Sequence, residues 1–179
     1  MMTVATSLSD PLVQQAWQVL DTLTDPEIPV VILRDMGIVR AVLRRDEGLE
    51  IIITPTYSGC PAMEQIEDDV RATVQQLGVP VRVTTRLSPA WTTDWMNDTA
   101  REKLRDYGIA PPRRCALTGE NVLQFAPRTA AHRADADQPA CPRCGSGQTT
   151  EVSHFGSTAC KALYKCLSCL EPFDYFKPY

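Results

Sequence analysis

Two pairs of cysteines near the end of the chain have the spacing of a tetrahedral metal site. The 21 residues 145–165 separate the pairs, which are Cys141 with Cys144 and Cys166 with Cys169. Each C-x-x-C pair turns the backbone so that two thiolates point at one centre. Two such pairs complete a tetrahedron around a metal about 2.3 Å from each sulfur. The spacing therefore predicts a zinc ribbon over residues 141–179, held by these four cysteines.

Zinc is the expected metal in this ribbon, although thiolate tetrahedra also suit iron, as a single ion or as a cluster. Two unrelated pairs of reduced cysteines, or two disulfides in an exported protein, are alternatives that the spacing disfavours. A site with four protein ligands has no open position, so its expected role is structural. A ribbon this short has too small a core to fold alone, so metal binding would supply its folding free energy.

A second group of reactive side chains lies in the first half of the chain. Asp25 and Glu27 stand on an expected loop, because the prolines beside them are incompatible with a helix or a central strand. Cys60 precedes Pro61, where a helix is expected to begin, so the helix dipole should lower the pKa of its thiol. Solvated loop acids remain the more ordinary interpretation of the two carboxylates, and a small buried hydrophobic residue is an equal alternative for Cys60.

The remaining elements must position these side chains. Apolar residues at helical spacing predict helices over 11–23, 61–77 and 95–107. Alternating and β-branched runs predict strands over 35–43, 49–54 and 81–87. The order α-β-β-α-β-α indicates an α+β fold, with a small three-stranded sheet packed by helices and followed by the four-cysteine ribbon. The expected domains are residues 10–110, an irregular segment and linker over 111–140, and the ribbon over 141–179.

Two further residues of the ribbon are secondary candidates for metal ligands. His154 and Cys160 lie between the cysteine pairs, but four thiolates already complete the expected site. The aromatic residues of the tail should supply the small core of the ribbon; they are Phe173, Tyr175, Phe176 and Tyr179.

Composition excludes several classes of function. The chain of 179 residues carries a net charge of −4, which argues against nucleic-acid and anionic-membrane partners. No apolar run approaches the roughly 18 residues that span a bilayer, and the first ten residues lack the pattern of a signal peptide. Seven cysteines, an odd number, fit a reducing compartment. We expect a cytoplasmic protein.

Three motifs resemble a known family. Asp25-Pro26-Glu27-Ile28-Pro29, Asp35-Met36-Gly37-Ile38-Val39 and Ser58-Gly59-Cys60-Pro61 resemble the iron–sulfur assembly domain, a former domain of unknown function that occurs in the SUF-type T factor. That resemblance covers roughly residues 10–107. With the ribbon motifs Phe155–Lys161 and Glu171–Phe176, nearly the whole chain resembles the phenylacetate-degradation protein D family, also known as the J subunit of phenylacetyl-CoA oxygenase.

The resemblance implies an accessory role in maturing phenylacetyl-CoA epoxidase in aerobic phenylacetate catabolism, not an enzymatic one. Cys60, Asp25 and Glu27 would then be transient ligands for iron or an iron–sulfur cluster. The implied partners are the epoxidase subunits, especially the iron–sulfur reductase or the di-iron subunit, together with a general iron–sulfur assembly scaffold and a second copy of the chain. A non-catalytic docking subunit of the epoxidase complex is the alternative.

Two other functions fit less well. A nucleic-acid-binding ribbon needs a basic surface, whereas residues 141–179 carry four basic and three acidic side chains, a net of +1. An enzyme with Cys60 as nucleophile or redox thiol needs a base or a second thiol beside it, for which Cys115 and Cys160 are the candidates.

Overall fold

The computed structural model describes residues 10–113 and 138–179, and the chain divides into two compact units. The first unit runs to Tyr107 and includes Tyr179, and the second runs from Gly108 to Pro178. Most of the predicted linker, with Cys115, falls outside the described residues. Among the described helices, none combines the length and the apolar character needed to cross a membrane.

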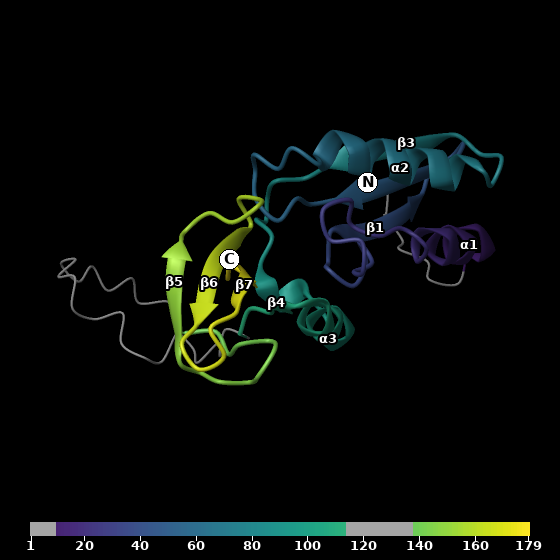
Figure 1. Ribbon diagram of the computed structural model, residues 1–179. Helices are drawn as coiled ribbons and strands as arrows, with labels where there is room; N and C mark the ends of the chain where they lie inside the picture. The colour runs from purple at the N-terminus through teal and green to yellow at the C-terminus, as the bar shows by residue number, and fades with distance from the viewer. Residues whose placement is uncertain (1–9, 114–137) are drawn as a thin grey trace, which may run out of the picture. The chain divides into compact units, whose positions relative to one another are not determined.

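The first unit is built on a three-stranded sheet in the order β1-β2-β3 (Figure 1). Strand β1 (Val39–Arg44) pairs antiparallel with β2 (Leu49–Ile53), which pairs parallel with β3 (Val81–Thr85). The central strand is the most apolar of the three, and Ile51 and Ile53 are completely buried. β-Branched side chains favour this pleated setting. The predicted α+β fold with a small sheet is confirmed.

Two helices cover one face of that sheet. Helix α1 (Pro11–Leu20) contacts β1 and helix α2 (Met63–Gln75), and α2 contacts β3. Alternation along β2 places Ile51 and Ile53 on one face of the sheet and Ile52 on the other, and all three are buried. Asp10 caps α1 as expected, since its Oδ1 accepts a hydrogen bond of 2.8 Å from the Leu12 N–H.

Several element boundaries differ from the predicted ones. Helix α1 stops at Leu20, and α2 begins at Met63 after a turn that contains Pro61. A short 3₁₀ helix (Thr93–Trp95) precedes α3 (Asp98–Tyr107), where a single helix from residue 95 was expected. The physical reason is the cap: the Asn97 side chain accepts from the Ala100 N–H at 2.8 Å and so starts α3 there.

The segment Asp35–Gly37 is a turn that holds a distant loop, and not the start of a strand. The Trp91 indole N–H donates to the Met36 carbonyl at 2.9 Å, and the Asn97 side-chain amide donates to Asp35 Oδ1 at 2.7 Å. Gly37 has a φ of +72°, and a Cβ at this position would lie 2.7 Å from Trp95 Cβ. Gly37 therefore lets the backbone at Trp95 approach closely, and the Trp95 ring lies against the guanidinium of Arg40 on β1.

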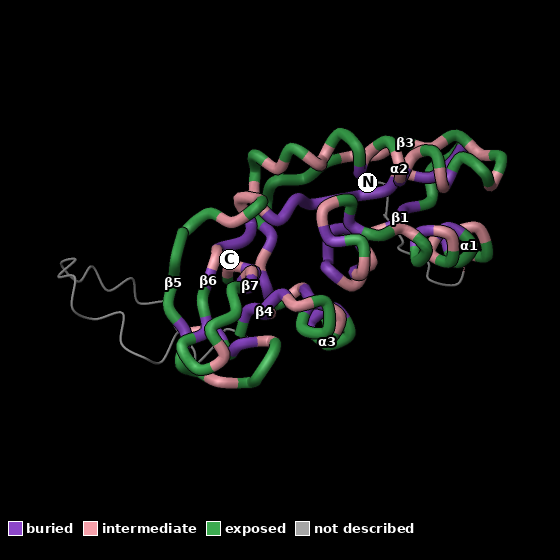
Figure 2. The backbone as a smooth tube through the Cα atoms, in the orientation of Figure 1, coloured by how far each residue is buried: buried purple, intermediate pink, exposed green. Residues whose placement is uncertain are grey.

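The second unit is a four-stranded sheet in the order β4-β7-β6-β5 (Figure 1). Strands β5 (Thr149–Ser153), β6 (Lys161–Cys166) and β7 (Pro172–Phe176) form an antiparallel ribbon. The short β4 (Ile109–Ala110), which was expected to belong to the first domain, pairs parallel with β7. Most of β5 is exposed, as the green trace in Figure 2 shows.

Candidate metal centre

The four predicted cysteine ligands lie together at one end of the ribbon. Their sulfur atoms are all within 4.8 Å of one another. The Sγ atoms of Cys141 and Cys169 are 3.7 Å apart, and those of Cys144 and Cys166 are 3.6 Å apart. A tetrahedral site with metal–sulfur bonds of about 2.3 Å has sulfurs about 3.8 Å apart. These separations therefore fit a zinc ion, which the four side chains would hold without an open coordination position.

Each cysteine pair sits in a tight turn of the same form. In the first turn the Gly145 N–H donates to the Cys141 carbonyl at 2.8 Å, and Gly145 has a φ of +74°. In the second turn the equivalent position is Leu170, with a φ of +65°. A non-glycine residue in this left-handed conformation costs roughly 1–2 kcal/mol. The second turn keeps the shape of the first despite that cost.

The thiols of this group differ in pKa. The Cys169 backbone N–H lies 3.4 Å from Cys166 Sγ and lowers the pKa of Cys166 to about 6. The Glu171 backbone N–H favours the thiolate of Cys169, but desolvation and the neighbouring sulfurs raise the pKa of Cys169 to about 12. One thiolate forms readily and opposes ionisation of the others, so four thiolates at this distance require a cation at their centre.

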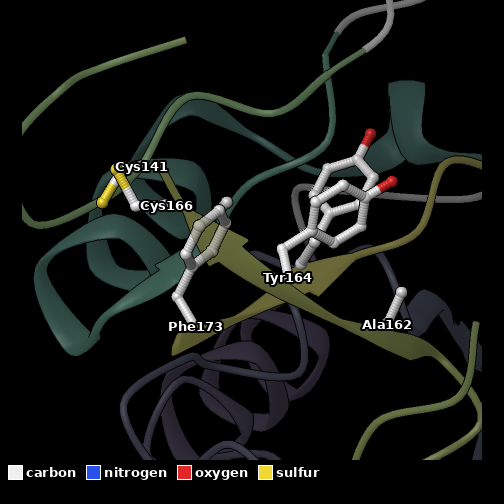
Figure 3. Packing of buried hydrophobic residues seen from close by; sticks show 7 residues of the cluster. Cys141, Ala162, Tyr164, Cys166 and Phe173 are labelled. Carbon is white, nitrogen blue, oxygen red and sulfur yellow. The ribbon is translucent and has the colours of Figure 1, made fainter. Parts of the chain in front are cut away.

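The aromatic core of the ribbon lies directly behind the cysteines. In Figure 3, Phe173 stands between the Cys141–Cys166 pair and Tyr164. The Tyr164 ring lies 5.9 Å from the Phe173 ring and 5.4 Å from the Tyr175 ring, centre to centre. The prediction that the tail forms this core is thus right for Phe173 and Tyr175, whereas Phe176 is buried outside this cluster. It is wrong for Tyr179, which belongs to the first unit and packs edge-on against Trp91.

The two second-rank candidates of the ribbon are not part of the four-cysteine group. His154 is exposed, with its Nδ1 3.5 Å from Glu151 Oε1 and its ring against Phe155. Cys160 is buried, and its Sγ lies 3.0 Å from Thr158 Oγ1. Neither residue supplies an atom to the close set of sulfurs.

The first unit brings Cys60 near the two loop carboxylates. Burial raises the pKa of the Cys60 thiol, and so do the negative charges of Glu27 and Asp25. A hydrogen bond from the Ala62 backbone acts in the opposite direction, but the pKa remains above its ordinary value. The predicted lowered pKa is therefore wrong. Burial is the largest of these effects and outweighs the hydrogen bond from the turn that leads into α2.

Asp25 shapes the loop that carries Glu27. Its Oδ1 accepts hydrogen bonds from the backbone N–H groups of Glu27, at 2.8 Å, and Ile28, at 2.9 Å. Only 9% of the Asp25 surface is exposed, so the interpretation of both acids as solvated fails for this one. Within the described part of the chain, Cys60, Asp25 and Glu27 do not form a close-set ligand group like that of the ribbon cysteines.

Tyr57 is a residue of this site that sequence reasoning missed. Its side chain hydrogen-bonds the Cys60 thiol, and its carbonyl accepts from the Cys60 N–H at 3.3 Å. The spacing of three residues across a glycine-containing loop is the signal that could have revealed it, because a tight turn brings such residues together.

Replacing Glu27 by glutamine should make Cys60 more reactive. Removal of one of the charges that raise the pKa lowers that pKa, so a larger fraction of the thiol is ionised at a given pH. We expect alkylation of Cys60 by iodoacetamide at pH 8 to accelerate about two- to fivefold, matching the 1 kcal/mol or less of a charge pair across water. Mass spectrometry of the Cys60 peptide measures the rate. Glu64→Gln, in the first turn of α2, is the matched control, and equal acceleration by both changes would contradict the assignment.

Two family models match the chain in the same order as its two units. The family described as "Iron-sulfur cluster assembly protein" matches residues 13–85, and the "PaaD zinc beta ribbon domain" matches residues 126–177. The first match contains Cys60 and both loop carboxylates, and the second contains all four ribbon cysteines.

Individual relatives match the same regions. An Escherichia coli (strain K12) protein, named as the putative D subunit of 1,2-phenylacetyl-CoA epoxidase, is 48% identical over 175 residues, which cover 96% of each chain. A Porphyromonas gingivalis protein named "Fe-S protein maturation auxiliary factor" is 34% identical over 49% of this chain and 85% of its own length. A solved structure of the domain of unknown function DUF59 from Bacillus anthracis is 26% identical, with a TM-score of 0.48, over 52% of this chain and 91% of that one. The chain therefore belongs to the family of the D subunit of phenylacetyl-CoA epoxidase.

Proposed function

We propose that this protein is an accessory factor that matures phenylacetyl-CoA epoxidase by assisting the insertion of iron or an iron–sulfur cluster. The observation that carries the proposal is the match of residues 13–85, which contain Cys60, Asp25 and Glu27, to the iron–sulfur assembly family; the negative charges of both acids also act on the Cys60 thiol. The name of the Escherichia coli relative supports the epoxidase as the client.

The chemistry of Cys60 suits a residue that binds iron or a cluster only transiently. A thiol of raised pKa keeps its proton at neutral pH, and an iron ion or cluster must displace that proton to bind. The proton competes with the metal, which weakens binding and eases release to a client. Glu27 would add a carboxylate oxygen, a ligand type that iron accepts beside sulfur. Asp25 would act by holding the loop.

The ribbon would have a structural and docking role. Zinc held by Cys141, Cys144, Cys166 and Cys169 would stabilise the second unit, which then presents its exposed surface to the client. The proposed clients are the iron–sulfur reductase and the di-iron subunit of the epoxidase, with a general assembly scaffold as the donor and a homodimer as the working form. A four-thiol site and a free Cys60 are suited to the reducing cytoplasm, where we place this function.

Metal and acid-labile sulfide analysis of anaerobically purified protein tests this proposal. The wild-type chain should carry one zinc together with iron or sulfide, and Cys60→Ser should lose the iron and sulfide but keep the zinc. Cys160→Ser is the matched control, because Cys160 is also outside the four-cysteine group, and it should behave like the wild type. Zinc alone in every protein would contradict metal handling and favour the alternative of a non-catalytic docking role in the epoxidase complex.

A further inference from the structure

The three-stranded sheet of the first unit has one face toward its helices and one face away from them. On β3, the Thr85 hydroxyl donates to the Glu67 carboxylate of α2, so Thr85 points to the helix side. Successive side chains of a strand alternate between the two faces. Arg82 and Thr84 therefore lie on the face away from α2, where Thr84 Oγ1 donates to Glu50 Oε1 of β2 at 2.7 Å.

Two arginines flank Glu50 on this second face. Arg45 Nε donates to Glu50 Oε2 at 2.9 Å, and Arg82 is the register partner of Glu50. The hydrogen bonds from Thr84 and Arg45, followed by the positive charges of Arg45 and Arg82, lower the pKa of the Glu50 carboxyl. Glu50 is therefore ionised at neutral pH and balances one of these two arginines.

Two further arginines extend the positive charge of this face. Arg86 lies two positions beyond Thr84, and its N–H donates to the Ile53 carbonyl at 2.8 Å, so the alternation of β3 continues to it. Arg40 and Arg86 are both exposed, and both lie beside Ile52, a residue of the same face. We use the name arginine face for the group of Arg40, Arg45, Arg82 and Arg86.

Most of this positive charge is not balanced within the unit. Among the residues that the structure describes, three members of the arginine face form no ion pair with a carboxylate; they are Arg40, Arg82 and Arg86. Asp46 and Glu47, the acids of the β1–β2 turn, form none with these arginines either. By contrast, the exposed Arg71 of α2 pairs with Asp68.

The rest of the unit is acidic. Residues 10–107 contain sixteen acidic and ten basic side chains, a net charge of −6. Helix α2, on the other side of the sheet, carries four acidic residues and one arginine. The charges of the unit are thus segregated, and the arginine face is a positive area on a negative body. Such an area attracts and orients an anionic partner.

Apolar side chains adjoin the arginines. Leu87, which follows Arg86 in the chain, is 57% exposed. The guanidinium carbon of Arg40 lies 3.4 Å from the centre of the half-buried Trp95 ring, so this arginine is held in place. Arginine and large apolar or aromatic residues together are typical of protein–protein interfaces.

We propose that the arginine face is a docking surface for a partner protein with an acidic surface patch. The planar guanidinium group matches a carboxylate with two parallel hydrogen bonds, and Leu87 and Trp95 would contact apolar side chains of the partner. A protein fits better than a nucleic acid, because a long phosphate backbone would continue onto the acidic remainder of the unit, which repels it. The surface goes beyond the proposed function, since it does not depend on iron or on Cys60.

Binding of a glutamate decapeptide to the full-length, zinc-loaded protein tests the proposal. Fluorescence anisotropy of the labelled peptide is the readout. We expect saturable binding with a dissociation constant below about 1 mM at about 20 mM salt. Because salt screens exposed charges, binding should weaken about tenfold or more at about 300 mM salt. A glutamine decapeptide of equal length, which has no charge, should not bind.

A matched pair of double variants locates the contact. Arg82→Gln with Arg86→Gln should weaken binding of the glutamate peptide about fivefold or more. Arg71→Gln with Arg105→Gln removes the same charge from exposed positions on α2 and α3, so it should change binding much less. The arginine Nε–H signals of Arg82 and Arg86 should shift in nuclear magnetic resonance spectra when the peptide is added.

Four results would overturn the proposal. They are absence of saturable binding up to about 1 mM peptide, equal weakening by the two double variants, tighter binding of a thymidine decanucleotide than of the glutamate peptide, and salt-sensitive self-association that Arg82→Gln with Arg86→Gln abolishes. The last result would assign the arginine face to a second copy of the chain. Each leaves the proposed handling of iron by Cys60 standing, because no readout here involves metal at that thiol.

Discussion

Replacing Cys144 by alanine is expected to remove the metal from the ribbon and to unfold the second unit. Three thiolates cannot complete the tetrahedron, and structural zinc in small ribbons contributes about 10–16 kcal/mol, comparable to or larger than the whole stability of a domain. The zinc content should fall from one per chain to none. Hydrogen exchange of the β5, β6 and β7 amides should rise to the rate of an unfolded chain, while α1, α2 and β2 keep their protection.

Cys160→Ala is the control for this experiment. Cys160 is buried in the same unit but lies outside the four-cysteine group, so its replacement should retain one zinc and a folded ribbon. Protection of β5 to β7 that survives in Cys144→Ala would contradict the structural role of the metal.

Gly37→Ala should destabilise the first unit by about 2–5 kcal/mol. The left-handed backbone at this position costs an alanine roughly 1–2 kcal/mol, and the new Cβ adds an overpacking term of roughly 1–3 kcal/mol. That second contribution arises because the Cβ would lie 2.7 Å from Trp95 Cβ and 2.8 Å from the Trp95 carbonyl oxygen. Urea unfolding, followed by the fluorescence of the first unit, measures the change in the free energy of unfolding.

Gly78→Ala separates the two contributions. Gly78 has nearly the same φ, +74°, but nothing lies within 4 Å of a Cβ built there. Gly78→Ala should therefore lower the free energy of unfolding only by the backbone contribution of roughly 1–2 kcal/mol. Equal destabilisation by both changes would show that the close approach of Trp95 to Gly37 is not important for stability.

The metal centre was predictable from sequence because each C-x-x-C turn is local. Cys141 and Cys144, like Cys166 and Cys169, are brought together by a few backbone dihedral angles, so spacing alone indicates the ligand set. The three sheet strands were also predictable, since alternation and β-branched residues report a half-buried strand directly. The conformation of Leu170, in the second cysteine turn, could not be predicted, because only the folded site imposes a positive φ on a leucine.

The state of Cys60 could not be predicted in the same way. Its pKa depends on burial and on Glu27 and Asp25, which reach it from a loop more than thirty residues earlier in the chain. The residues next to Cys60 in the sequence indicate only the helix that follows, so the predicted direction of the pKa shift was wrong.

Maturation of the epoxidase in cells is the most direct test of the proposed function. Cells that lack this chain would produce the epoxidase subunits together with the wild-type protein, Cys60→Ser or Cys160→Ser, at matched levels and with zinc content verified. Iron and sulfide bound to the purified epoxidase subunits, together with epoxidase activity, are then measured. We predict that Cys160→Ser restores both to the wild-type level and that Cys60→Ser leaves them at the level of cells without the protein. Full restoration by Cys60→Ser would contradict a role of this thiol in delivering iron or a cluster.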